Sequence, residues 1–249
     1  MTTVLRASGL SKHFHGLRAV SNVSFSVEAG SIHSVIGSNG AGKTTLFNLL
    51  SGGLVPTAGA VEVSGKSITN RPPEYFVALG VVRTFQITSI FSELSVWENV
   101  ALAVRSHLGR NYSLRVKKRS DRQVSESVSE ILRSVNLASR SSVVAGSLSH
   151  GERRVLELGI GLGLDPTIML LDEPMAGVSA HDRHVLRDLI LNLRKESGLT
   201  VLLVEHDVEL VFDISDRITV MHQGSVIADG SPAAIQQNEA VRASYLGAR

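Results

Sequence analysis

The residues with the clearest chemical pattern form a glycine-rich run that ends in a lysine and two threonines. The run, GSNGAGKTT at residues 37–45, stands between a predicted strand and a predicted helix. Glycines let backbone N–H groups turn inward around an anion, and the helix start adds its positive dipole end. This spacing predicts a phosphate loop for a nucleoside triphosphate, with Lys43 at the β- and γ-phosphates and the Thr44 hydroxyl at Mg²⁺. The predicted binding residues are Ser38, Asn39, Gly40, Ala41, Gly42, Lys43, Thr44 and Thr45.

A second group of polar residues follows two apolar runs. TIMLLDEP ends in Asp172 and Glu173, and LTVLLVEHD carries His206. Such runs are typical of strands buried on both faces of a parallel sheet, and ligands bind beyond the carboxyl ends of these strands. We therefore expect Asp172 to hold Mg²⁺ through water and Glu173 to orient or deprotonate the attacking water. His206 could hydrogen-bond the γ-phosphate or that water, although a lone histidine there is more often structural.

The segment SLSHGERRVLELG, residues 147–159, sets a serine directly beside a histidine. Ser149 as a nucleophile with His150 as its base is disfavoured, because adjacent residues at a helix start do not easily hydrogen-bond and no third group orients the histidine. Ser149 and Glu152 instead match a capping box before an apolar helix. A capped helix start followed by Gly151 also presents free backbone N–H groups, which favour a bound anion.

The remaining patterns predict the elements that position these groups. Alternation at residues 24–27 predicts a half-buried antiparallel strand, and residues 218–230 predict a hairpin. Helical periodicity covers residues 121–137 and the stretch between the two apolar runs, which Gly198 ends. Ser231 and Pro232 predict one more helix start. Strands and helices thus alternate around an all-helical insert, which predicts an α/β fold with a helical subdomain.

Composition excludes several classes of protein. The 249 residues include 43% hydrophobic and 19% charged residues, as in an ordinary globular protein. A net charge of +2 gives no bulk indication of nucleic-acid binding. The apolar runs are too short to cross a bilayer, and we expect no signal peptide. The absence of cysteine excludes disulfides and thiolate metal sites and fits the cytoplasm.

Taken in order, the motifs resemble the ATP-binding subunits of ABC transporters over nearly the whole chain. They are GSNGAGKTT, RTFQ at residues 83–86, LSHGE at 148–152, IMLLDE and His206, and LSHGE is the most specific. The resemblance implies an α/β phosphate-loop NTPase (RecA-like) core with an antiparallel β subdomain and an inserted α-helical subdomain. It implies one ABC ATPase domain, with the nucleotide-binding core at 1–87 and 152–230, the helical subdomain at 88–151 and a C-terminal helical tail at 231–249.

The resemblance also implies residue roles in an enzyme that uses ATP and Mg²⁺. Phe14 is similar to the aromatic residue that stacks on adenine, and a core aromatic is the alternative. Gln86 is similar to the glutamine that senses Mg²⁺ and the γ-phosphate, and a polar surface glutamine is the alternative. Ser149 and the Gly151 amide would hold the γ-phosphate of ATP bound to a second subunit. The implied catalytic residues are Lys43, Gln86, Glu173 and His206, and the implied metal ligands are Thr44, Gln86 and Asp172.

Two positions depart from the family pattern. Many members have proline where Ser38 stands, but backbone amides contact the phosphates there, so we expect little effect. Many members have aspartate where Ser179 stands, in the loop that crosses the dimer interface. The inter-subunit contact that the aspartate makes in the family is therefore less readily assigned to Ser179. The serine fits a pair of non-identical ATPases.

Longer stretches resemble the ATPases of branched-chain amino acid importers, among them LDEPMAGVS and the C-terminal VMHQGSVIADGSPAAIQQNEAVRASYLG. The resemblance implies an ATP-hydrolysing subunit that energises a permease for branched-chain or other hydrophobic amino acids. ATP would close a dimer and hydrolysis would open it. The resemblance implies three partners. They are a second ABC ATPase subunit, identical or not, the membrane permease subunits and, indirectly, a substrate-binding protein. Residues 87–94 would contact the permease. No nucleic acid is implied, and the location would be the cytoplasmic face of the cell membrane.

Other interpretations stay open at this point. Importers of urea, amides or other amino acids have very similar ATPases. A soluble ABC ATPase of DNA repair or translation is disfavoured by the single compact half without long coiled coils. A non-hydrolysing module is disfavoured by intact Lys43, Glu173 and His206. A basic cluster is either a solvated helix face or a site of attraction to anionic lipid; it comprises Arg105, Arg110, Arg115, Lys117, Lys118, Arg119 and Arg122.

Overall fold

The computed structural model describes residues 2–84, 90–109 and 118–243 of the chain. They form two compact units. The first unit comprises residues 1–83, 167–173 and 194–249, and the second comprises residues 84–166 and 174–193. The domain boundaries expected from the sequence stay a prediction, and the whole of the helix that follows Ser149 belongs to the second unit.

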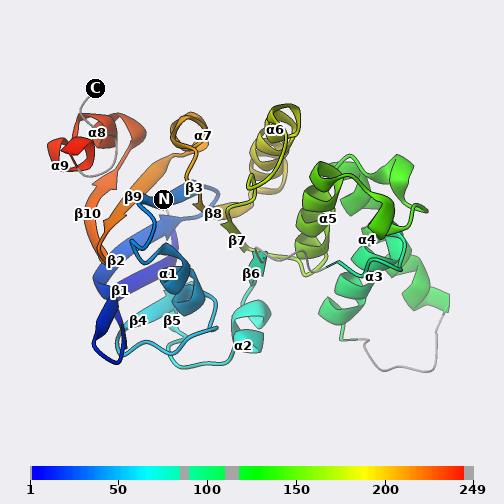
Figure 1. Cartoon of the computed structure of the whole chain (residues 1–249). Helices are drawn as coiled ribbons and strands as arrows, with labels where there is room; N and C mark the ends of the chain where they lie inside the picture. The colour runs from blue at the N-terminus through cyan, green and yellow to red at the C-terminus, as the bar shows by residue number, and fades with distance from the viewer. Residues whose placement is uncertain (1, 85–89, 110–117, 244–249) are drawn as a thin grey trace. The chain divides into compact units, whose positions relative to one another are not determined.

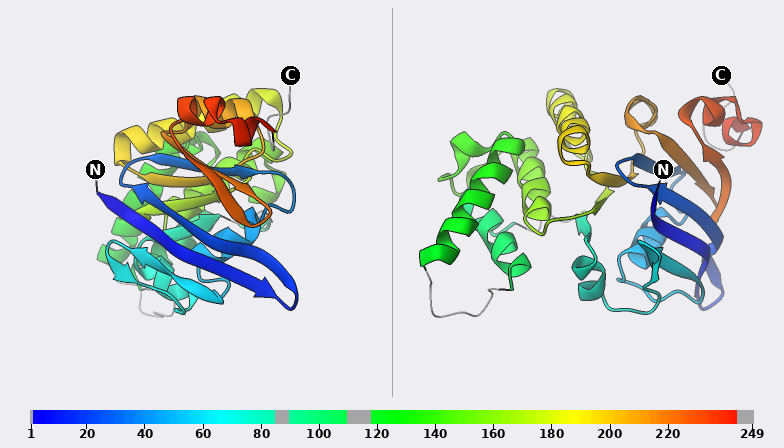
Figure 2. Two further views of the ribbon diagram at one scale, coloured as in Figure 1. Left: turned by 90° about the vertical axis from the view of Figure 1, so that its left-hand side faces the viewer. Right: turned by 180° about the vertical axis from the view of Figure 1, so that it is seen from behind.

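The first unit contains an antiparallel sheet with the strand order β2-β1-β4-β5. Two long strands, β1 and β2, pair antiparallel and are drawn in blue in Figure 2. Every second residue from Val23 to Val27 on β2 is buried, which confirms the half-buried strand expected from the alternation there. The bounds are β1 Thr3–Phe14, β2 Leu17–Glu28, β4 Ala58–Val63 and β5 Lys66–Ser67.

A second sheet has the strand order β10-β9-β3-β8-β7-β6 (Figure 1). β3 runs parallel to β8 and β9, β7 runs parallel to β8, and β10 forms the expected hairpin with β9. All residues of β3, β7 and β8 are buried, which explains the apolar runs of β7 and β8. The bounds are β3 Ile32–Gly37, β6 Val81–Thr84, β7 Ile168–Asp172, β8 Thr200–Val204, β9 Arg217–His222 and β10 Ser225–Gly230.

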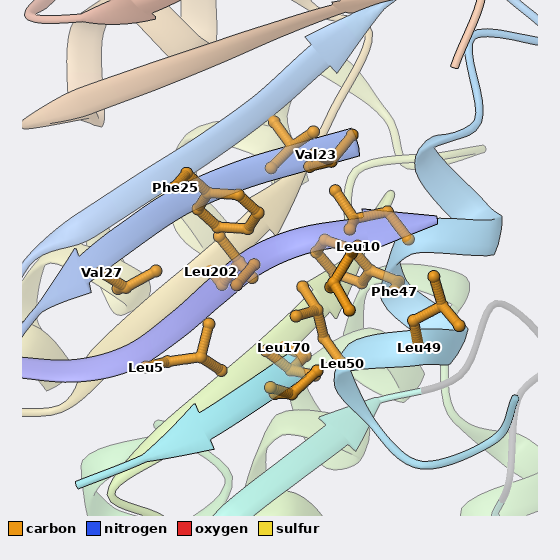
Figure 3. Packing of buried hydrophobic residues seen from close by; sticks show 14 of the residues in the cluster. Leu5, Leu10, Val23, Phe25, Val27, Phe47, Leu49, Leu50, Leu170 and Leu202 are labelled. Atoms are coloured by element: carbon orange, nitrogen blue, oxygen red, sulfur yellow. The ribbon is translucent and has the colours of Figure 1, made fainter. Parts of the chain in front are cut away.

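Both sheets and the first helix contribute to one apolar core. Phe47, Leu49 and Leu50 of α1 cluster with side chains of β1, β2, β7 and β8 (Figure 3). Ser231 caps α8 with Pro232 in its first turn, as the sequence predicted. The helices of this unit are α1 Lys43–Leu50, α2 Pro73–Ala78, α7 Val208–Ile214, α8 Pro232–Gln237 and α9 Glu239–Val241.

The second unit is built from helices. Val124, Val128 and Leu132 are buried along one face of α4, which confirms the helical periodicity expected there. α3 and α5 each begin with a capping box, formed by Ser95 with Glu98 and by Ser149 with Glu152. Its elements are α3 Val96–His107, α4 Lys118–Ser134, η1 Ala138–Arg140, η2 Ala145–Ser147, α5 His150–Leu162 and α6 Ala180–Ser197. Only the part of α6 up to Leu193 belongs to this unit.

His33 is a buried polar residue on the strand that leads into the phosphate loop. Its Nε2 atom lies 2.7 Å from the Thr219 hydroxyl, which donates to Asp229 at 3.0 Å. Burial lowers the pKa of His33 from 6.5 to about 4, although the Asp229 carboxylate raises it. His33 is therefore neutral in the folded protein at neutral pH.

We predict that this histidine makes the protein less stable in mild acid. Its folded pKa of about 4 lies below the unfolded value of 6.5, so its contribution is complete above pH 6.5. Between pH 6.5 and 4 the unfolded chain takes up the proton first, and up to about 3 kcal/mol of unfolding free energy is lost. Denaturant titrations of the wild type and His33→Gln over this window should show a steeper fall for the wild type. His13→Gln is the control and should follow the wild type, whereas parallel curves for all three would contradict the prediction.

Candidate nucleotide-binding site

The phosphate loop leaves β3 and enters α1 at Lys43, as the sequence predicted. Lys43 is only 7% exposed, and its Nζ donates to the carbonyl oxygens of Gly37 at 2.7 Å and Ser38 at 3.1 Å. Gly42 is the N-cap of α1, and no side chain in the described part of the chain caps this helix. The first N–H groups of a helix have no partner inside it, so this uncapped start can receive an anion.

Two glycines of the loop are required by the strands around it. Gly42 has φ +97°, and a Cβ there would collide with the carbonyl oxygen of Ala19. A Cβ on Gly37 would collide in the same way with the carbonyl oxygen of Met221. Gly40 has φ +78° but open space around the position of a Cβ. The close approach of neighbouring backbone therefore requires glycine at positions 37 and 42. At Gly40 only the positive φ favours glycine.

The two acidic residues lie at the carboxyl end of β7. Asp172 is 2% exposed, and its Oδ2 accepts a 2.6 Å hydrogen bond from Arg83. Its other oxygen, Oδ1, is buried and has no hydrogen-bond partner among the described residues. Glu173 has φ +48°, and its N–H donates to the carbonyl of Val204 at 2.9 Å. A left-handed glutamate is a costly conformation of the kind that gathers at functional sites.

These groups act on Lys43 electrostatically. Burial lowers the pKa of Lys43, while the Glu173 and Asp172 carboxylates raise it. The structure thus brings together three residues that the sequence had assigned to one site from separate motifs. Hydrolysis of a phosphate anhydride requires a cation at the phosphates, a carboxylate that can bind a metal ion and a carboxylate that can act as a base. Lys43, Asp172 and Glu173 have these three properties.

His206 lies two residues beyond the end of β8, as expected, and its side chain is 61% exposed. Its backbone N–H donates to Glu205 Oε2 at 3.2 Å, and its Nδ1 lies 3.7 Å from the same oxygen. Glu205 is 0% exposed, and none of the sequence motifs assigned it a role. The position of Glu205 directly after an apolar strand could have indicated a functional residue. In the structure its carboxylate lies beside the His206 ring.

Phe14 is the last residue of β1 and is 40% exposed, so it is not a core aromatic. The Lys12 ammonium group lies 5.3 Å from the centroid of its ring. The exposed ring leaves adenine stacking as a prediction. Gln86 lies outside the described residues, as do the first three residues of the expected permease contact at residues 87–94. In the basic cluster, Arg105 is exposed and Arg122 pairs with Glu126, whereas the other five side chains lie outside the description.

The segment around Ser149 lies in the second unit, and there the capping box is confirmed. The Ser149 side chain accepts from the N–H of Glu152 at 3.2 Å, and Glu152 accepts from the N–H of Ser149 at 2.9 Å. The hydrogen bond from the Ser149 N–H to its carboxylate, with a contribution from Arg140, holds the pKa of Glu152 below its usual range. His150 Nε2 lies 3.4 Å from the carbonyl oxygen of Ala176. His150 is therefore engaged with a neighbouring loop and does not serve as a base for Ser149.

Gly151 and Ser179 explain the surroundings of this helix start. A Cβ on Gly151 would lie 2.7 Å from the carboxyl carbon of Asp182, so a larger residue there would have to displace the Asp182 side chain. Ser179 donates to Asp182 Oδ2 at 2.6 Å and accepts from the N–H of Asp182 at 3.2 Å. The serine that replaces the family's aspartate is thus used locally, at the start of α6. The Ser179-x-x-Asp182 spacing was a capping signal that the sequence analysis did not use.

The fold and the site define a phosphate-loop nucleotide-binding protein, and comparisons with known proteins narrow the class. The family model described as ABC transporter matches residues 20–176, and the model of the branched-chain amino acid ATP-binding cassette transporter matches residues 225–249. The chain belongs to the ATP-binding cassettes of ABC transporters. It therefore binds nucleotide and is an ATPase, which confirms the resemblance and the α/β phosphate-loop fold inferred from its motifs.

Individual relatives match along almost the whole chain. The chain is 41% identical over 249 residues to the high-affinity branched-chain amino acid transport ATP-binding protein BraF of Pseudomonas aeruginosa, with 98% of each chain covered. It is 37% identical to LivG of Escherichia coli, with the same coverage. The crystal structure of the ADP conformation of an ATP-binding cassette of an ABC transporter is similar with a TM-score of 0.87 and 30% identity, covering both chains completely.

We predict that the loop glycines differ in their tolerance of alanine. Gly42→Ala should lower the free energy of unfolding by more than about 2 kcal/mol, since the left-handed backbone costs about 1–2 kcal/mol and the new Cβ also collides with the carbonyl of Ala19. Gly40→Ala is the matched control and should cost only the backbone term of about 1–2 kcal/mol. Urea denaturation of both variants checks this, and equal destabilisation would contradict it.

Proposed function

We propose that this chain is the ATP-hydrolysing subunit of an importer for branched-chain or other hydrophobic amino acids. The observation that carries the ATPase part is that Lys43 follows β3 while Asp172 and Glu173 lie at the end of β7, and both strands run parallel to β8, so the three residues lie at the same edge of the sheet. The substrate class rests on the names of BraF and LivG and of the C-terminal family model, all three of which refer to branched-chain amino acids. Importers of urea or amides are not favoured by these matches.

In the proposed mechanism the loop and Lys43 bind the triphosphate. Backbone N–H groups at the start of α1 face the phosphates, and Lys43 exchanges its carbonyl partners in the loop for phosphate oxygens. Glu173 orients the attacking water and accepts its proton, with His206 beside the γ-phosphate. Phe14 supports the adenine ring, and Gln86 senses Mg²⁺ and the γ-phosphate.

Mg²⁺ fits the residues present. Mg²⁺ usually takes one or two carboxylates and keeps waters and substrate phosphates as its other ligands. Asp172 offers a buried oxygen without a partner among the described residues, and Thr44 is an exposed residue in the first turn of α1. Within the ranges that the structure describes, no group of three or more His, Asp or Glu side chains could form an all-protein metal site. Bound with ATP, Mg²⁺ neutralises charge on the β- and γ-phosphates.

A second ATPase subunit completes the proposed site. Ser149 and the N–H of Gly151, at the start of α5, bind the γ-phosphate of ATP held by the partner. Closure of two subunits assembles both sites and excludes water, and hydrolysis releases them. The motion is passed to membrane permease subunits at the cytoplasmic face, through residues 87–94, and a substrate-binding protein delivers the amino acid. No helix among the described residues is both long and apolar enough to span a membrane.

Glu173→Gln should bind ATP and form dimers but lose about 10²–10⁴-fold in turnover, because a glutamine cannot accept the proton of the attacking water. ATPase rates, nucleotide binding and gel filtration with ATP measure the three properties. Glu196→Gln, an exposed position on α6, is the control and should keep wild-type turnover. Wild-type turnover in Glu173→Gln would show that another group is the base.

Ser149→Arg should leave ATP binding to the single subunit intact and stop hydrolysis, because the side chain blocks the helix start that contacts the partner's phosphate. The change also removes a helix cap, which costs about 1 kcal/mol. Ser95→Arg is a matched control, since Ser95 forms the same capping box at the start of α3. Both variants should lose similar stability, and only Ser149→Arg should lose ATPase activity. Equal activity in the two variants would reject a phosphate contact for Ser149.

A further inference from the structure

Arg83 joins three parts of the first unit, although no role was assigned to it from the sequence. One terminal nitrogen donates to Asp172 Oδ2 at 2.6 Å, and the other donates to Asn48 Oδ1 at 2.6 Å. The guanidinium carbon lies 5.9 Å from the centroid of the Phe47 ring. Arg83 thus connects the carboxyl end of β6 with helix α1 and with the end of β7.

The contacts hold the guanidinium group in place. The side chains of Arg83 and Asp172 are only 10% and 1% exposed, so water screens their attraction little. A planar guanidinium that bonds two partners in different directions cannot rotate without breaking one of them. The ion pair is therefore a fixed element of the unit.

The Arg83–Asp172 ion pair makes the two carboxylate oxygens of Asp172 different from each other. Oδ2 accepts from Arg83, whereas Oδ1 is buried and has no hydrogen-bond partner among the described residues. Buried polar atoms almost always have a partner, so a buried carboxylate oxygen without one indicates a ligand that is bound during function. The orientation set by Arg83 leaves Oδ1 for that ligand.

Asn48 extends this arrangement to the other predicted metal ligand. Asn48 lies four residues after Thr44 on α1, so the two side chains lie on the same face of the helix. By binding Asn48 and Asp172 together, Arg83 sets the spacing between the helix that carries Thr44 and the strand that carries Asp172.

We propose that Arg83 is a positioning residue that orients Asp172 toward Mg²⁺ and fixes the spacing between Asp172 and Thr44. Arg83 acts through its hydrogen bonds to Asp172 and Asn48 and does not itself contact nucleotide or metal. The inference rests on the proposed function, since it assumes that ATP binds at the phosphate loop together with Mg²⁺.

The test compares ATP affinity in EDTA with ATP affinity in Mg²⁺ for the full chain, because the ratio of the two dissociation constants isolates the contribution of the metal. Partners that orient metal ligands typically contribute about 10–100-fold to metal affinity. Arg83→Gln should therefore reduce the Mg²⁺-dependent gain by about 10–100-fold while ATP binding in EDTA changes little. Arg83→Lys keeps the charge but cannot bind both partners, and its loss should be intermediate.

Two further variants separate positioning from simple destabilisation. Arg217→Gln breaks another short Arg–Asp pair of the first unit, with Asp229 at 2.6 Å, and should keep the full Mg²⁺-dependent gain. Asn48→Ala leaves the Arg83–Asp172 pair in place and should reduce the gain less than Arg83→Gln does. Thermal unfolding of each variant in EDTA reports the structural effect separately.

Three outcomes would overturn the inference. An unchanged gain in Arg83→Gln would mean that the ion pair only stabilises the fold. A larger gain would mean that Arg83 competes with the metal for Asp172. Absence of any gain in the wild type would reject the proposed Mg²⁺ site itself and the inference with it, and this result is distinct from the first two.

Discussion

The candidate site depends on the burial of helix α1 by apolar side chains from both sheets. Leu46, Phe47 and Leu50 are completely buried, and they share one cluster with strands of the antiparallel and the mixed sheet. Burial of each such side chain contributes about 1.5–3 kcal/mol. An eight-residue helix has little stability of its own, so this packing keeps it formed. Because α1 is fixed at its apolar face, its first N–H groups stay directed at the phosphate loop.

The second constraint is the balance of buried charge. Lys43, Arg83 and Asp172 are all largely buried in the first unit, and an isolated charge in such a place would be very costly. Arg83 compensates Asp172, and Lys43 lies in the field of Asp172 and Glu173 while it bonds to loop carbonyls. The site therefore holds its charges in a stable arrangement that still offers Lys43 and one oxygen of Asp172 to a ligand.

Local patterns in the sequence were sufficient for much of this. The glycine spacing around Lys43, the acids after the β7 run and the Ser149–Glu152 capping box each lie within a few residues, so short-range rules predict them. The Arg83–Asp172 pair was not predictable in this way, because its members are 89 positions apart. Glu205 beside His206 and the Ser179–Asp182 contact had local signals that were not used. The structural description does not include Gln86 or most of the basic cluster.

The sequence by itself determined the family, the phosphate loop, the strand-end acids and the order of the motifs, because these depend on residue type and on spacing along the chain. The tertiary structure decided which oxygen of Asp172 has no hydrogen-bond partner among the described residues, why Gly42 must be glycine, that Gly151 lies against Asp182, and that His33 is neutral at neutral pH. Each of these follows from an approach between segments that are distant in sequence: β7 with Arg83, β2 with the loop, α6 with α5, and β9 and β10 with His33. Distance in sequence carries no information about such contacts, whereas packing determines them.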